Sequence, residues 1–351
     1  MKRSGTSKRF CRTAFATIGR RSFFWGLILF FSPFAVATEL QRYEFESLQM
    51  GVSVRIVLYT TDAEAAKNAA EAGFEQFRRL NTVMSDYDSE SELSMLTERR
   101  KTSDAPIPVS DDLFAVLKYA KHFSSISDGA FDVTVGPLTR LWRRSKRQRK
   151  LPEPQLLEQS RALVGNEHWE LDDSIRSVRL LRSGVRFDLG GIAKGYAIDR
   201  AFETIRQRGF EIVLVDAGGD FRLGKSPPGG WRIEIDGETV TTLKNIAMAT
   251  SGDKLRFVEI DDVRYSHLID PKTGLGLTES STVHVFASTA VEADALASTL
   301  SVLGSERGIL VVEAQKNASA KIILHEGDRV FESKRYQSVL RDVIIPSEKS
   351  H

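Results

Sequence analysis

The stretch Asp188-Leu189-Gly190-Gly191-Ile192-Ala193-Lys194-Gly195-Tyr196 runs from a predicted strand, Val185–Phe187, into a predicted helix over residues 193–207. The paired glycines free the backbone to approach a ligand, and a helix start exposes amides that suit a phosphate. A free carbonyl in the turn can face a cation, and Lys194 can reach a phosphate. A purely structural Gly-Gly turn explains the same spacing, so the spacing alone leaves both interpretations open.

Upstream of this stretch the sequence predicts a hairpin followed by a long helix. Two strands, 40–48 and 52–59, flank Met50-Gly51, and Asp62 is placed to cap the helix that follows. The apolar positions of that helix recur at helical spacing: Ala66, Ala69, Ala70, Phe74, Phe77 and Leu80.

The remaining pattern mixes helices with groups of strands instead of alternating one strand with one helix. This predicts an α+β protein with mixed sheets packed against long helices. The other predicted helices are a short one at 93–96 and longer ones at 111–125, 155–163 and 291–303. The other predicted strands are 168–171, 178–181, several between 212 and 260, 282–286, and three near Val311, Ile322 and Val330.

Charge divides the chain into two unlike parts. Residues 1–37 contain seven basic residues, no acidic residue and the only cysteine, Cys11. The remainder, 38–351, has 42 basic and 47 acidic residues, a net charge of −5. That body lacks the bulk positive charge on which many nucleic-acid binders depend, so we predict no nucleic-acid partner. Without cysteine it also has no disulfide, thiolate zinc site or cysteine nucleophile.

The first 37 residues have the pattern of a secretory signal peptide. A basic segment precedes the apolar run Phe23–Phe31, and Ala35-Val36-Ala37 predicts cleavage after Ala37. Nine apolar residues fall well short of the roughly 20 that span a bilayer, which disfavours a retained anchor. Arg20-Arg21-Ser22-Phe23-Phe24 fits a twin-arginine signal, although adjacent arginines also occur in ordinary signals. We therefore predict a periplasmic protein, 38–351, without a lipid anchor because no cysteine follows the cleavage point.

Two segments invite a nucleotide-binding interpretation. Residues 140–150 contain seven basic residues and are predicted as a solvated loop, with docking of an acidic partner or a nucleotide phosphate as the alternative. Residues 219–226 match a phosphate-loop pattern, but that mechanism needs a helix to begin at Lys225-Ser226. Because Pro227-Pro228-Gly229-Gly230 follows, the match is interpreted as accidental.

Three further segments carry chemistry of their own. Asp294 and Ser298 are spaced i, i+4 and share one helix face, where a carboxylate and a hydroxyl form a hard-oxygen set suited to Mg²⁺. An exposed helix face is the alternative. His267, three residues before Asp270, is a candidate acid or base or a structural histidine. The glycine-bounded segment 128–137 contains an aromatic residue and can flank a planar ring.

In this order the segments resemble the ApbE family of flavin transferases (FAD:protein FMN transferases), from about Met50 to Gly304. The matching blocks are Met50-Gly51, Ser85–Leu93, Gly129–Leu138, Asp188–Tyr196, Gly218-Gly219-Asp220, Ala249–Gly252, His267–Gly274 and Ala293–Leu303. Each block alone is weak evidence for the family, whereas eight blocks in the family's order are a specific signature of it.

The resemblance implies a set of ligand-binding residues. The positions that correspond to FAD contacts are Met50, Tyr87, Ala130, Phe131, Asp132, Asp188, Lys194 and Ile269. It also implies Mg²⁺ ligands: the Gly191 carbonyl, Asp294 and Ser298. The family most often has threonine where Ser298 stands, and serine keeps the hydroxyl oxygen. Ala297 replaces a residue that in some members is a further carboxylate ligand, which limits a second metal ion.

The implied reaction is Mg²⁺-dependent transfer of FMN from FAD to a Thr or Ser hydroxyl of an exported or membrane-bound acceptor flavoprotein, with release of AMP. His267 is the candidate general base. The alternatives are an FAD pyrophosphatase that uses water in place of the hydroxyl, and a non-catalytic flavin-binding assembly factor. With its export signal the chain also resembles the NosX group, which implies the membrane flavoprotein of nitrous oxide reduction as acceptor.

Overall fold

The computed structural model describes residues 39–99, 105–235, 239–254 and 256–340. Within these residues the largest sheet has eight strands, all paired antiparallel, in the order β1-β2-β6-β7-β10-β13-β14-β15. The predicted signal peptide, 1–37, lies outside the described residues. The strands are β1 (Gln41–Gln49), β2 (Val52–Thr60), β6 (Val213–Ala217), β7 (Asp220–Leu223), β10 (Ala247–Gly252), β13 (Ser281–Ala287), β14 (Ser319–Leu324) and β15 (Arg329–Glu332).

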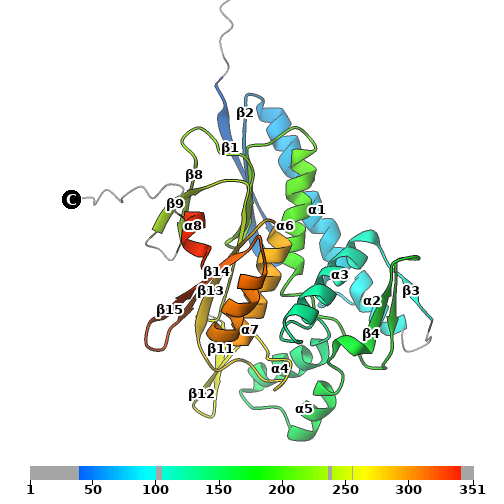
Figure 1. The fold of residues 1–351 in the computed structure, drawn as a ribbon. Helices are drawn as coiled ribbons and strands as arrows, with labels where there is room; N and C mark the ends of the chain where they lie inside the picture. The colour runs from blue at the N-terminus through cyan, green and yellow to red at the C-terminus, as the bar shows by residue number, and fades with distance from the viewer. Residues whose placement is uncertain (1–38, 100–104, 236–238, 255, 341–351) are drawn as a thin grey trace, which may run out of the picture. The chain divides into compact units, whose positions relative to one another are not determined.

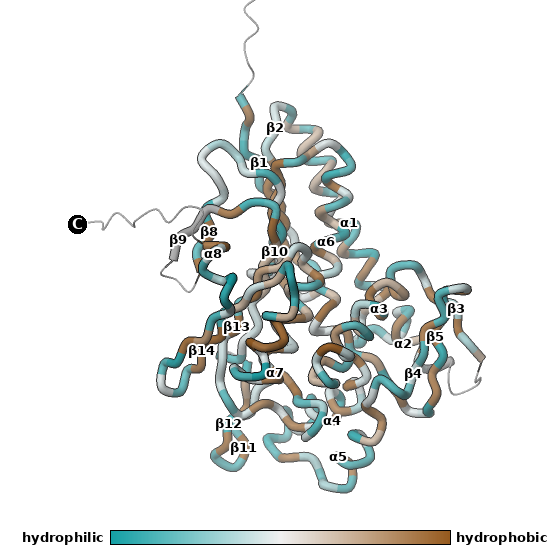
Figure 2. Tube along the Cα trace, viewed as in Figure 1, coloured by the Kyte–Doolittle hydropathy of each residue, from teal (hydrophilic) through white to brown (hydrophobic). Residues whose placement is uncertain are grey.

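Three long helices cover one face of this sheet (Figure 1): α1 (Ala63–Met84), α6 (Ala193–Arg206) and α7 (Ala290–Ala314). Along β2, Val54, Ile56 and Leu58 are buried toward these helices, whereas Val57 packs on the other face. Period-two alternation therefore builds two cores, one on each side of the sheet. Hydrophobic residues are concentrated along the central strands and α7 (Figure 2).

The other face of the sheet is covered by the hairpin β8 (Trp231–Ile235) and β9 (Thr239–Leu243) together with the short helix α8 (Tyr336–Leu340). Beyond the three long helices lie α2 (Glu92–Arg99), α3 (Asp111–Ile126) and the small sheet β3-β5-β4. Its strands are β3 (Ile107–Pro108), β4 (Trp169–Asp172) and β5 (Ser177–Leu180), and the single-turn η1 (Asn166–His168) precedes β4.

The last group of elements consists of α4 (Gly136–Gln148), α5 (Pro154–Arg161) and the hairpin of β11 (Phe257–Ile260) and β12 (Val263–Ser266). Trp142 of α4 packs against Tyr265 of β12 with ring centroids 5.5 Å apart. Its indole nitrogen donates to the Ser266 carbonyl at 3.2 Å. This small third core holds α4 against the segment that contains His267.

The α+β prediction is confirmed, and three local predictions are wrong. The basic segment 140–150 belongs mostly to α4, because Leu138, Trp142 and Ser145 give it one buried face. Val311 lies in α7, which continues past a non-helical Gly304 instead of giving way to a strand. Residues 185–187 form only an isolated bridge, Val135 with Arg186, and no regular strand.

The phosphate-loop match is accidental, as predicted. Its residues fold as β7 and the turn into β8, and no helix begins at Lys225. Among the described helices, α7 has the length and apolar composition of a membrane span. Its Leu296 and Leu300 are buried in the main core, and α7 packs on α6, β10 and β13, so it serves as a core helix.

Candidate active site

Two predicted ligand loops are joined by backbone hydrogen bonds. Asp188 N donates to Val133 O at 2.7 Å, and Gly136 N donates to Arg186 O at 3.2 Å. A Cβ at Gly136 would lie 2.5 Å from that same Arg186 carbonyl, so this approach requires glycine. The segment 130–135 is thereby fixed beside the turn that begins α6.

The three predicted metal ligands meet where α6 begins beside α7. A Cβ at Gly191 would lie 2.9 Å from Ser298 Oγ, so the turn backbone directly faces that hydroxyl. One turn earlier on α7, Asp294 accepts a hydrogen bond from Gly195 N at 2.8 Å. The predicted shared helix face of Asp294 and Ser298 is present, and Asp294 is buried instead of exposed. The close contact is possible because Gly195 has no side chain to collide with α7.

A buried ion pair lies next to Asp294. Lys194, from the first turn of α6, pairs with Asp220 of β7, which also accepts from Thr250 N at 2.9 Å. Burial raises the pKa of Asp294 to about 7, and the carboxylate of Asp220 adds to the rise while Lys194 opposes it. Burial alone lowers the pKa of Lys194, but Asp220 and Asp294 outweigh it and raise the pKa. Two carboxylates therefore lie beside one ammonium, and ionisation of Asp294 above about pH 7 leaves negative charge that one lysine does not balance.

This donor set fits a magnesium ion. A carboxylate, a hydroxyl and a backbone carbonyl are hard oxygen ligands of the kind that Mg²⁺ takes. Within the described residues no group of three or more His, Cys, Asp or Glu side chains is placed to hold a metal, so the carbonyl and the hydroxyl are essential to this set. A carboxylate that burial disfavours as an anion gains most from a cation beside it.

A second cluster lies around Asp188. Arg143 of α4 contacts Asp86 at 2.7 Å and Asp188 at 3.7 Å, and its guanidinium lies 4.0 Å from the centroid of the Tyr87 ring. Asp188 also accepts from Gly190 N at 2.8 Å. Burial, with the charge of Asp188, raises the pKa of Asp86. Tyr87 is 79% exposed, so most of its ring remains accessible to a planar ligand.

The segment Ala130–Asp132 is buried. Phe131 lies beside Gly191, because a Cβ there would come 3.4 Å from the ring edge. Asp132 accepts from the amide and the hydroxyl of Thr134 at 2.8 and 2.6 Å. Burial raises its pKa. These bonds show a structural role for Asp132, and its contact with FAD stays a prediction.

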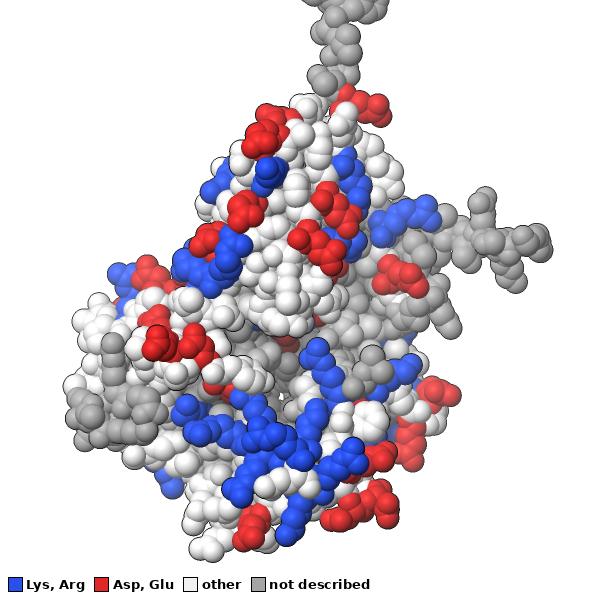
Figure 3. All heavy atoms as spheres, turned by 180° about the vertical axis from the view of Figure 1, so that it is seen from behind, with Lys and Arg blue, Asp and Glu red and all other residues white. Residues whose placement is uncertain are grey.

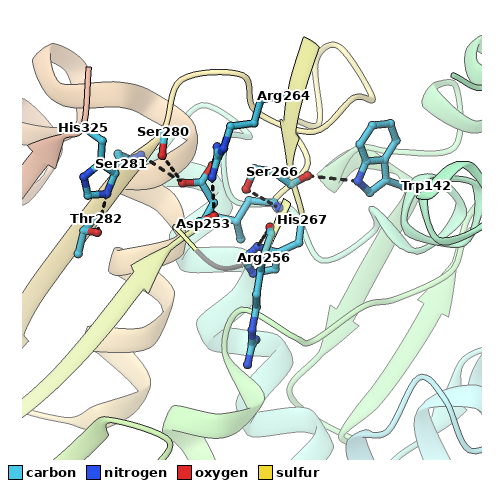
Figure 4. A network of polar contacts seen from close by, with 11 residues as sticks. Trp142, Asp253, Arg256, Arg264, Ser266, His267, Ser280, Ser281, Thr282 and His325 are labelled. Atoms are coloured by element: carbon cyan, nitrogen blue, oxygen red, sulfur yellow. Dashed lines mark hydrogen bonds and ion pairs between the residues drawn. The ribbon is translucent and has the colours of Figure 1, made fainter. Parts of the chain in front are cut away.

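His267 follows β12 and is half-buried. Its Nδ1 lies 3.1 Å from the carbonyl oxygen of Arg256 (Figure 4). Because a carbonyl only accepts, Nδ1 carries the proton and Nε2 of the neutral ring is left as the base. Burial lowers the pKa of His267, and the positive charges of Arg256 and Lys146 act in the same direction. The neutral ring therefore persists through neutral pH.

The last two predicted FAD-contacting residues are Met50 and Ile269. Met50 has φ 48° in the turn of the β1–β2 hairpin, and the backbone of Gly218, in the turn before Asp220, bonds Ser53 O at 3.0 Å. Met50 thus lies at the same end of the sheet as Asp220. Ile269 forms an isolated bridge with Gly276 and packs on the third core.

Comparison with known proteins shows the family of the chain. A flavin transferase ApbE from Vibrio cholerae has a TM-score of 0.77 and 29% identity, over 86% of this chain and all of that one. The ApbE family profile matches residues 50–323. The chain belongs to the ApbE family. A flavinyl transferase ApbE from Pseudomonas stutzeri, in its apo form, also has a TM-score of 0.77, at 26% identity.

Curated relatives agree with this assignment. An FAD:protein FMN transferase from Haemophilus influenzae is 34% identical over 271 residues, which is 73% of this chain and 78% of that protein. One from Vibrio cholerae is 36% identical over 250 residues, covering 68% and 74% respectively. The predicted resemblance is confirmed.

Sequence reasoning passed over four ionic residues of this ApbE-family site. Asp220 was noted only within a matching block, and it lies in the stretch dismissed as an accidental phosphate loop. Arg143 lies in the segment predicted as a loop, and Asp86 is named only as part of the matching block Ser85–Leu93. Arg256, whose charge acts on His267 and on Lys194, gave no signal. The helical spacing of Leu138, Trp142 and Ser145 was a clue that Arg143 lies on a helix.

Proposed function

We propose that the protein transfers the FMN half of FAD to a Thr or Ser hydroxyl of an acceptor flavoprotein and releases AMP. The observation that carries the proposal is the meeting of Gly191, Asp294 and Ser298 beside the Lys194–Asp220 pair. Membership of the ApbE family, whose curated relatives are FAD:protein FMN transferases, supports it.

The Gly191 carbonyl, the Asp294 carboxylate and the Ser298 hydroxyl would hold Mg²⁺. When bound, the metal neutralises pyrophosphate charge as a Lewis acid. Lys194 is kept protonated by two carboxylates and is placed to hold a phosphate oxygen of FAD. The protein's contribution is mainly positioning, since in-line displacement at phosphorus needs little covalent help.

His267 would accept the proton of the acceptor hydroxyl through Nε2. The hydroxyl oxygen then bonds to the FMN phosphorus, the pyrophosphate P–O bond breaks, and AMP leaves with that oxygen and its negative charge. Because Nδ1 is hydrogen-bonded to Arg256 O, the ring keeps one orientation and one tautomer. Tyr87 would offer an exposed aromatic surface to the flavin, with Asp188 held near it by Arg143, and the buried Phe131 would border the flavin site beside Gly191.

The acceptor and the compartment are part of the proposal. The export pattern of residues 1–37 supports a periplasmic location through the twin-arginine route, cleavage after Ala37 and no lipid anchor. An acceptor in that compartment is an exported or membrane-bound flavoprotein, such as that of a nitrous oxide reduction system.

The test is to incubate the protein, from residue 38 onward, with FAD, Mg²⁺ and candidate acceptor domains, and to measure acceptor mass and AMP. Transfer predicts an acceptor heavier by FMN with AMP released in equal amount. Free FMN with an unlabelled acceptor indicates a pyrophosphatase, and FAD bound without turnover indicates an assembly factor. Asp294→Ala should abolish turnover, whereas Glu306→Gln, an exposed carboxylate on the same helix, should not.

A further inference from the structure

A groove lies between α4 and α5, and Arg186, whose carbonyl accepts from Gly136 N beside the candidate active site, also lines it. Its volume is about 590 Å³. Arg140 and Arg144, one helical turn apart, line it from α4 together with Leu141. Leu156 and Leu163 line it from α5 and the residues after it. Cationic, polar and apolar side chains thus share one concave surface, which is called the α4 groove below.

Most basic residues of the segment 140–150 have no ion pair with another residue of the described chain. Arg143 is paired with Asp86 and Asp188. For the other six of the segment, no ion pair occurs within the described part of the chain, and all six are exposed: Arg140, Arg144, Lys146, Arg147, Arg149 and Lys150. Figure 3, which views the molecule from behind, shows basic side chains gathered in its lower part, the part in which Figure 1 places α4 and α5. This excess of positive charge stands out on a body with net charge −5.

We propose that the α4 groove docks an acidic segment of the acceptor protein. The proposal rests on the proposed function, because it gives that reaction its protein substrate. Charge complementarity identifies the partner as acidic, and such patches mainly raise encounter rate and specificity. The leucines between the arginines offer apolar contacts to a chain segment that enters the groove.

A flat anionic membrane fits this surface less well. The groove is concave, so a bilayer would not reach its leucines.

The α4 helix connects the groove to the proposed chemistry. Its Trp142 bonds Ser266 O, the residue before His267, and Lys146 is close enough for its charge to act on the His267 ring. An α-helix is about 10 Å across, a distance that roughly three extended residues span. A segment bound in the groove would need only a few further extended residues to cross α4 toward His267.

The probe is a fluorescent decaglutamate peptide, with binding measured by anisotropy at low and at physiological salt. We expect saturable, salt-sensitive binding that weakens about tenfold in the double variant Arg140→Ala/Arg144→Ala. The matched control is Arg232→Ala/Arg329→Ala, which removes two exposed arginines from β8 and β15 with the same change in net charge. That control should bind like the unaltered protein.

Three results overturn the proposal: no binding of the peptide, equal loss in both double variants, or loss in neither. Binding to phosphatidylglycerol vesicles that depends on Arg140 and Arg144, without binding of the peptide, assigns the groove to a membrane and also overturns it. Circular dichroism of each variant shows that altered binding does not reflect unfolding.

Transfer kinetics separate this proposal from the proposed function. With a protein acceptor, Arg140→Ala/Arg144→Ala should raise the acceptor KM about tenfold and leave FAD affinity unchanged. If the unaltered protein transfers no FMN to any acceptor, the proposed function fails. Peptide binding then still tests, independently of catalysis, whether the α4 groove binds an acidic segment. If transfer occurs and the acceptor KM does not change, the α4 groove is not the docking site.

Discussion

An Asp294→Asn variant is expected to be inactive and yet more stable than the unaltered protein when magnesium is absent. Asp294 is buried on α7, and its carboxylate accepts one hydrogen bond, from Gly195 N at 2.8 Å. Asparagine has almost the same shape and can keep that bond through its carbonyl oxygen. The variant therefore removes the charge and little else.

The size of the effect follows from the pKa. Burial raises the pKa of Asp294 from an ordinary 3.8 to about 7, with Asp220 adding to the rise against the opposing charge of Lys194. A tenfold change in proton affinity is worth about 1.4 kcal/mol, so the ionised carboxylate costs the fold about 4 kcal/mol at pH 8. For an acid with a raised pKa this cost is absent below pH 4, grows as pH rises toward 7, and is constant above. The advantage of Asp294→Asn should follow the same course.

The assay is urea unfolding at pH 5 and pH 8, with EDTA or with Mg²⁺. With EDTA, Asp294→Asn should gain several kcal/mol at pH 8 and clearly less at pH 5. Mg²⁺ should stabilise only the unaltered protein, by about 3 kcal/mol at a hundredfold excess over its dissociation constant. Glu306→Gln, an exposed carboxylate on the same helix, should show neither effect. An Asp294→Asn protein that is less stable at pH 8, or that Mg²⁺ stabilises equally, would refute the reasoning.

Three further variants test neighbouring parts of the site. Lys194→Met leaves Asp220 buried without its cation and should cost about 3–5 kcal/mol at pH 7.5, with partial recovery at pH 5; full stability in urea unfolding at pH 7.5 would contradict the pairing. His267→Gln should lower the transfer rate at least a hundredfold with FAD affinity kept, and it should abolish the fall in rate that the unaltered protein shows at acidic pH. Gly191→Ala brings a Cβ to 2.9 Å from Ser298 Oγ and should weaken Mg²⁺ binding at least tenfold in calorimetry, with the thermal midpoint in EDTA little changed.

The fold was largely predictable where local pattern and tertiary packing agree. The turn at Met50-Gly51 has positive φ at both residues, which suits a tight hairpin, and all six apolar positions predicted for α1 are buried. Asp62 caps that helix by accepting from Ala65 N at 3.0 Å. Each of these features depends on residues that are near neighbours in the chain, so a single sequence contains enough information.

Two of the three wrong predictions share one cause, because a strong local signal concealed a weaker structural one. Seven basic residues suggested a loop at 140–150, although Leu138, Trp142 and Ser145 recur at helical spacing. At Gly304 the backbone has φ 73°, so ending the helix there was reasonable, yet a second helical segment follows and buries Val312. Whether a helix continues after such a residue depends on whether the following residues can pack into the hydrophobic core, as Val312 does.

The contacts of the candidate site also divide into those that sequence spacing predicts and those that depend on tertiary packing. Asp294 and Ser298 are one helical turn apart, so their shared face was predictable from spacing. That Gly191 faces Ser298, and that Lys194 meets Asp220, depends on how α6 packs on α7 and how β6 pairs with β7. No spacing within one element contains that information, and the resemblance to a family supplied it only for the metal ligands.

The α4 helix has two charged surfaces, one toward the candidate active site and one toward solvent. Arg143 is neutralised by Asp86 and Asp188, whereas Arg140 and Arg144, on a neighbouring side of the helix, have no carboxylate within the described residues. If these arginines served only solubility, ion pairs with acidic neighbours would stabilise the helix, and residues 38–351 have more acidic than basic residues. Exposed unpaired cations beside a concave, partly apolar surface are instead the arrangement expected of a site that binds an acidic partner. Because α4 carries these arginines and also packs against the segment that contains His267, a partner bound to α4 would lie near the proposed general base.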